Sequence, residues 1–208
     1  NDTIAMLNLG IILSSKDYTD TPDPSYSVKL WKKAAQKGDS HAQYLLGLSY
    51  HNGIGGLIKD KKECFKWLKK SADQGFPNAQ YLLGLSYSEG YGVTKDHKEA
   101  IKWVKKAADQ GYSKAQNSLG YSYLLGINGV SKNIIKGIKL IKKAADQGNP
   151  DAEYTLGLYY YTGDGSSIPK DNKKSYYWMQ KAVDQGYSRA QNALGQSYLY
   201  GVNGFSKD

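Results

Sequence analysis

Residues 40–52, SHAQYLLGLSYHN, contain the block that decides the fold, an alanine followed four residues later by leucine and glycine. In this stretch Ala42, Leu45, Leu46 and Tyr50 recur at helical spacing, so they form one apolar face. The block returns six times in all, with its glycine at Gly10, Gly47, Gly84, Gly120, Gly157 and Gly195. Successive copies are 37, 37, 36, 37 and 38 residues apart. This period predicts a solenoid of stacked units, because one unit alone cannot bury its apolar face.

A second block, such as residues 70–75, KSADQG, follows each copy of the first block except the last and predicts the end of a second helix. Its final glycine suits the left-handed position that follows a helix. Asp60 and Asp96, each followed three residues later by Glu, are typical of a capping box at the start of that helix, while Asn133 and Asp171 fit simple N-caps. Each unit therefore reads as two helices, A and B, joined by a glycine-rich turn.

The glycine of the first block lies inside helix A, where it should cost about 1 kcal/mol relative to alanine. We interpret it as the place where helix B crosses too closely for a side chain. Helix B supplies a matching column of small residues that includes Cys64, so we interpret this cysteine as a packing residue and not as a catalytic thiol. The neighbouring column contains Trp67, Trp103 and Trp178, which we expect to pack between repeats.

The composition, over 208 residues, excludes several classes of protein. No apolar run approaches the roughly 20 residues that a membrane span needs. The single cysteine excludes an internal disulfide framework. The net charge of +9 comes from lysines, since Arg189 is the only arginine, and most of these lysines stand beside acidic residues, as on a solvated helix face. The absence of a signal or transmembrane segment slightly favours the cytoplasm. We also expect that residues 1–208, which form a single array, are part of a longer protein.

The two blocks resemble the Sel-1-like repeat, a relative of the tetratricopeptide repeat. The resemblance rests on Ala42-x-x-x-Leu46-Gly47-x-x-Tyr50, on the turn at residues 90–96 and on their copies along the whole chain. It implies an all-α, right-handed superhelical solenoid of antiparallel helix pairs, with about five and a half repeats. It also implies a non-catalytic adaptor or scaffold. Two copies depart from the pattern: the first replaces the glycine turn with residues 14–24, and the sixth ends before a second helix.

The resemblance further implies that helix A lines a concave surface that binds a partner protein or peptide without a cofactor. Residues flanking the packed Leu-Gly-x-x-Tyr face would then point into the groove and provide anchor pockets and polar contacts. The alternative is that many of these side chains pack between repeats. The residues that we expect at this surface are His41, Tyr44, Leu48, His51, Tyr81, Leu85, Lys114, Tyr121, Tyr154, Leu158, Tyr161 and Arg189.

Three other functions compete with the scaffold. Catalysis is disfavoured because the three histidines show no metal-ligand spacing and no nucleophile motif is present. RNA binding by a helical repeat is the main alternative, but the candidate columns are mostly Tyr and Leu, and arginine occurs once. A third hypothesis is that a lysine ridge of helix B binds an acidic membrane surface. The ridge includes Lys32, Lys33, Lys69, Lys70, Lys105, Lys106, Lys142 and Lys143. The sequence favours the protein scaffold, with nucleic acid an unlikely partner.

Overall fold

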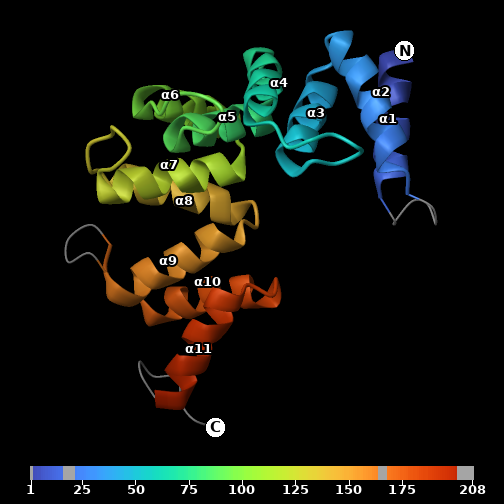
Figure 1. Ribbon diagram of the computed structural model, residues 1–208. Coiled ribbons are helices and arrows are strands. Elements are labelled where there is room, and N and C mark those ends of the chain that lie inside the picture. The colour runs from blue at the N-terminus through green and yellow to red at the C-terminus, as the bar shows by residue number, and fades with distance from the viewer. Residues whose placement is uncertain (1, 16–21, 164–167, 201–208) are drawn as a thin grey trace. The chain divides into compact units, whose positions relative to one another are not determined.

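The computed structural model describes residues 2–15, 22–163 and 168–200, and over these residues the chain is helical, with connecting turns and no strand. Helix A and helix B alternate along the chain (Figure 1). The predicted all-α class is confirmed. The helices are α1 Asp2–Ser14, α2 Pro24–Gln36, α3 Ser40–Asn52, α4 Lys61–Asp73, α5 Pro77–Glu89, α6 His97–Asp109, α7 Ser113–Leu125, α8 Ile134–Asp146, α9 Pro150–Thr162, α10 Asn172–Asp184 and α11 Ser188–Tyr200.

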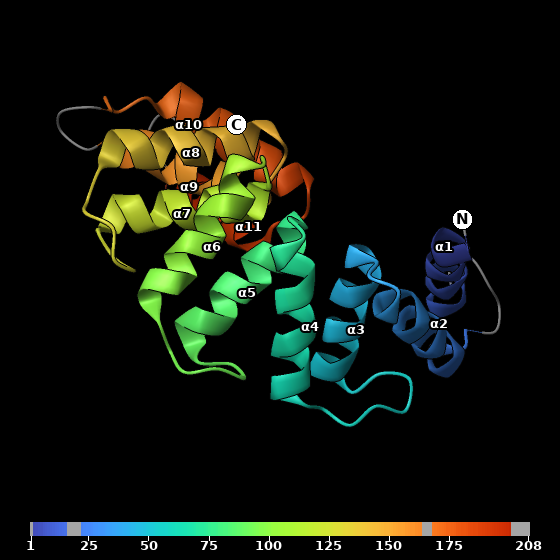
Figure 2. The ribbon, with the colours of Figure 1, turned by 90° about the horizontal axis from the view of Figure 1, so that it is seen from above.

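The chain divides into two compact units, residues 1–110 and residues 111–208. Unit 1 contains α1 to α6, in which α1–α2, α3–α4 and α5–α6 form helix pairs, and α2–α3 and α4–α5 join neighbouring pairs. Unit 2 contains α7 to α11, with the pairs α7–α8 and α9–α10 joined through α8–α9 and followed by α11. The pairing of α3 with α4 is visible in both views (Figures 1 and 2). Within each unit the pairs stack in sequential order, as a solenoid requires.

Helix B begins where the sequence predicts, but one capping bond differs. The Asp60 carboxylate accepts hydrogen bonds from the backbone N–H groups of Lys62 and Glu63 at 2.8 and 3.0 Å. In a full capping box the Glu63 side chain would return to the Asp60 N–H. That N–H instead donates to the Tyr50 carbonyl at 3.1 Å, and Glu63 accepts from the Trp67 indole N–H at 3.1 Å. Only half of the capping box is therefore formed, and Asp96 with Glu99 repeats the arrangement.

The glycine inside helix A marks a close crossing with helix B, as predicted. A Cβ added to Gly47 would lie 3.2 Å from Leu68 Cγ and 3.4 Å from the Cys64 carbonyl oxygen on α4. The small column of helix B faces the crossing, and Cys64 is 2% exposed. Cys64 is thus a packing residue.

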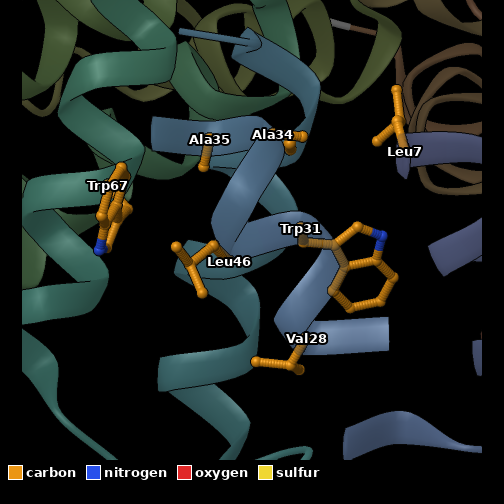
Figure 3. Packing of buried hydrophobic residues seen from close by; sticks show 8 residues of the cluster. Leu7, Val28, Trp31, Ala34, Ala35, Leu46 and Trp67 are labelled. Atoms are coloured by element: carbon orange, nitrogen blue, oxygen red, sulfur yellow. The ribbon is translucent and has the colours of Figure 1, made fainter. Parts of the chain in front are cut away.

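The core of each unit crosses from one repeat to the next. In unit 1 the cluster of Val28, Trp31, Ala34 and Ala35 from α2 extends to Leu46 on α3 and Trp67 on α4 (Figure 3). In unit 2 Trp178 joins Ile141 and Ala144 of α8. The prediction that the tryptophan column packs between repeats is confirmed. The unusual turn of the first copy includes residues 16–21, and the sixth copy ends in residues 201–208, both outside the described residues.

Candidate functional site

The residues predicted to line the binding surface all lie on helix A, and none of them is buried. They do not form one uniform surface. Eight of the twelve line hollows, three in unit 1 and five in unit 2. The other four, His41, Tyr44, Tyr81 and Lys114, line none of the hollows described below.

The unit 1 cleft is a hollow of about 240 Å³ between α3 and α5, with α4 beneath it. Its wall is formed by Leu48 from α3 and by Leu82 and Leu85 from α5. Cys64 and Leu68 of α4 contribute to the lining from the buried side. A cleft with these walls suits an apolar side chain, since apolar surface removed from water contributes roughly 25 cal/mol per Å².

Polar groups stand at the unit 1 cleft beside its apolar walls. His51 lies in the last turn of α3, and its ring is 5.1 Å from the Tyr91 ring and inclined to it at 53°. Glu89 and Ser86 of α5 complete the lining. Lys61 Nζ lies 5.2 Å from the Tyr91 ring centroid, within the range of a cation–π contact. The cleft thus combines apolar walls with polar groups that can orient a peptide backbone.

The Cys64 thiol beside this cleft is not a nucleophile in the folded protein. Burial, with a smaller contribution from the Asp60 carboxylate, raises the pKa of Cys64 from 9.0 to about 11. The reactive form of cysteine is the thiolate. Cys64 therefore stays a neutral thiol at physiological pH and adds apolar surface to the cleft.

The unit 2 groove consists of two adjoining hollows that share Tyr154 and Leu158 of α9. The hollow toward α7, of about 340 Å³, is also lined by Tyr121 and by Arg189 of α11. The hollow of about 330 Å³ on the other side continues to Tyr161. The groove therefore joins predicted residues from three successive copies of helix A.

A hydrogen-bonded network holds one end of the unit 2 groove. The Tyr187 hydroxyl donates to Asp151 Oδ1 at 2.5 Å, and the Tyr187 ring lies 5.7 Å from the Tyr154 ring. Burial, followed by the bond to Asp151, raises the pKa of the Tyr187 hydroxyl, while Arg189 lowers it. Tyr154 is thus held against a fixed aromatic neighbour, which reduces the entropy that it would lose on binding.

Two predicted residues pack within the protein. The His41 ring stacks on Phe76 with centroids 5.2 Å apart, and the Tyr44 ring lies 5.2 Å from the same phenylalanine. For these two the packing alternative describes the structure better than an open surface does.

Sequence reasoning missed several lining residues. Glu89 and Tyr91 come from the end of α5 and the turn after it, and Tyr187 comes from the turn before α11. The sequence signal was available for Tyr91, which stands between two glycines in the repeated turn.

The lysines of the helix B ridge contact side chains of their own helix. Lys69 forms an ion pair with Asp73 at 2.8 Å, and Lys142 forms one with Asp146 at 2.8 Å. Lys70 and Lys106 lie over the rings of Trp67 and Trp103, 4.4 and 4.0 Å from the centroids. These contacts favour the interpretation of the ridge as a solvated helix face over a membrane-binding surface.

Among the described residues, no helix is both long and apolar enough to cross a membrane. The same residues contain no cluster of three or more His, Cys, Asp or Glu side chains that could hold a metal ion.

Stacked helix pairs with clefts between successive A helices define a helical repeat protein. The Sel1 repeat matches residues 3–39, 40–76, 77–112, 113–149, 150–187 and 188–208, so the chain belongs to the Sel1 repeat family. The comparison with curated proteins found no match. Members of the family generally serve as scaffolds for protein–protein interaction.

Solved structures agree with this assignment. A Sel1 repeat protein from Oxalobacter formigenes is 34% identical, with a TM-score of 0.91 over 99% of this chain and 82% of that chain. The protective antigen c5321 of uropathogenic Escherichia coli, which displays an SLR fold, is 28% identical, with a TM-score of 0.64 over 99% of this chain and 50% of that chain. The immunity protein Pa5087 of Pseudomonas aeruginosa shares the fold at 24% identity, with a TM-score of 0.62 over 90% of this chain and 67% of that chain.

Proposed function

We propose that the chain is a non-catalytic scaffold that binds a partner protein or peptide through the helix A surface, in the unit 1 cleft and the unit 2 groove. The observation that carries the proposal is the meeting of Leu48, Leu82 and Leu85 in one open, apolar cleft with His51 and Glu89 beside it. A buried apolar anchor surrounded by polar contacts is the usual arrangement of a peptide-binding site.

The partner chemistry differs between the two places. The unit 1 cleft suits one aliphatic or small aromatic side chain. The unit 2 groove offers the rings of Tyr121 and Tyr154, with Leu158 between its two hollows, so it suits an extended segment that lies along the ring faces. The RNA-binding alternative receives no support from the comparisons.

Affinity capture with matched variants tests the proposal. Leu85→Ser removes an apolar wall of the unit 1 cleft, and Leu158→Ser does so in the unit 2 groove. The controls are Ile58→Ser and Ile135→Ser, whose side chains are exposed and line neither hollow. The proposal expects a protein that the wild type and both controls retain, and that at least one cleft variant loses. An identical set of retained proteins on all five baits would refute it, provided that each variant unfolds at the wild-type temperature.

A further inference from the structure

In unit 1 a glutamine of helix A joins a repeat to the one before it at two successive positions, Gln43 and Gln80. Gln80 on α5 is 5% exposed, and its amide N–H donates to the Ala72 carbonyl at the end of α4, at 3.2 Å. Its amide oxygen accepts from Gln110 Nε2, which follows α6, at 2.7 Å. Gln43 makes the equivalent two bonds one repeat earlier. One side chain thus donates to the end of the preceding helix B and accepts from the glutamine that follows the helix B of its own repeat. We call this pair of hydrogen bonds the joint between two repeats.

Glu153 occupies this position on α9, and there the donating half of the joint is missing. It is 0% exposed and accepts from Gln185 Nε2 at 2.7 Å, as the glutamines do. An ionised carboxylate has no proton to donate to Ala145, which stands eight residues earlier, as Ala72 stands before Gln80. Glu153 Oε1 has no hydrogen-bond partner and makes only a long ion pair, 3.5 Å to Lys181 Nζ.

We propose that the joint between α8 and α9 is sensitive to pH and tightens when Glu153 takes up a proton. The protonated side chain has one O–H donor and one carbonyl acceptor, which is the hydrogen-bonding capacity that glutamine uses at the equivalent joints. It then donates toward the end of α8 and still accepts from Gln185. The ionised side chain instead brings a negative charge toward the carbonyl groups at the C-terminus of α8, which themselves carry partial negative charge.

The surroundings of Glu153 act in the same direction. Burial raises the pKa of Glu153 above 4.5, and the Asp184 carboxylate adds to the increase, while Lys181 and Gln185 oppose it. The charged groups that act on it, Lys181 and Asp184, both come from α10. Because the folded protein holds this proton more tightly than the unfolded chain, protonation stabilises the joint. The stabilisation is complete below pH 4.5 and is lost as the pH rises through the raised pKa.

Hydrogen exchange of residues 141–160 in the full chain, measured between pH 4.5 and 8 and corrected for the intrinsic rate, tests the proposal. Glu153→Gln restores the missing donor. At pH 7 we expect the equilibrium constant for local opening in Glu153→Gln to be about fivefold smaller than in the wild type, the change that the net contribution of one hydrogen bond produces. The difference should vanish toward pH 4.5. The converse variant Gln80→Glu should create the same pH dependence between α4 and α5.

Two results would overturn the proposal. The first is exchange in Glu153→Gln that follows the wild type at every pH, with Gln80→Glu equally insensitive. The second is a direct titration of the Glu153 carboxyl carbon by NMR that gives a pKa at or below the ordinary value. The titration needs no variant and therefore remains decisive if a substitution impairs folding.

Discussion

The Cγ2 methyl of Val104 occupies the space that a side chain on Gly84 would need, since a Cβ added to that glycine would lie only 2.7 Å from it. The Ala100 carbonyl oxygen, 3.0 Å from the same point, closes the other side. Helix A and helix B of one repeat meet here almost backbone to backbone. The recurring glycine is therefore a requirement of packing, and its unfavourable helix propensity is offset by the close crossing.

Gly84→Ala should destabilise unit 1. The backbone carbonyl cannot move away as a flexible side chain would, so α5 and α6 must separate, and we expect a loss of about 1–3 kcal/mol in the free energy of unfolding. Urea denaturation measures it. Gly195→Ala is the matched control, because no described atom lies within 4 Å of a Cβ at that helical glycine, and it should stabilise by about 0.5–1 kcal/mol. Equal stability of Gly84→Ala and the wild type would show that the crossing is looser than described.

Glu63→Ala should lower the free energy of unfolding by about 1 kcal/mol, because it leaves the indole N–H of the largely buried Trp67 without its acceptor. Glu63 also pairs with Lys66 at 2.7 Å on the exposed side. Lys66→Met removes that ion pair, together with an outlying cation–π contact of 6.0 Å to the Trp67 ring, and keeps the indole bond to Glu63, so it should leave the unfolding midpoint nearly unchanged. Similar losses in the two variants would mean that the ion pair, and not the indole bond, is what Glu63 supplies.

The stability of the wild type should fall as the pH rises from 9 to 11, relative to Cys64→Ala. In this range the thiol of the unfolded chain ionises, whereas burial keeps the folded thiol, with a pKa of about 11, neutral. The unfolded state is therefore favoured progressively, and the loss is complete once the pH has passed the folded pKa. Unfolding midpoints of the two proteins, measured from pH 8 to 11.5, provide the test. Parallel pH profiles would contradict the burial of the thiol.

The fold is predictable from the sequence because the residues that start and stop the helices recur with the same period as the apolar faces. The bounds predicted for the helix at residues 40–52, the N-caps at Asp60 and Asp171, and the tight crossing at Gly47 depend on neighbours within one repeat. The hydrogen bond from the Trp67 indole to Glu63 was not predicted. The Glu63 side chain can accept either from the Asp60 N–H, as in a capping box, or from the indole one helical turn further on. The second bond forms because the Asp60 N–H already donates to the Tyr50 carbonyl.

The candidate site was predictable only in part. Leu48, Leu85 and Tyr154 follow from the helical face alone. The stacking of His41 and Tyr44 on Phe76 depends on how the next repeat is placed, and the spacing of residues within one helix does not determine that placement. The contribution of Tyr91 depends in turn on the path of a glycine-rich turn. Helix periodicity therefore indicates a surface, whereas the hollows on that surface arise from contacts between repeats.

Site-specific photo-crosslinking tests most directly whether the helix A surface holds the partner. A photoreactive amino acid is placed at His51 in the unit 1 cleft and at Tyr121 in the unit 2 groove, with Ile58 and Ile135, which are also exposed, as control positions. After capture and irradiation, the account predicts adducts of the retained partner from position 51 or position 121 and none from the controls. Adducts from positions 58 or 135 alone would contradict it.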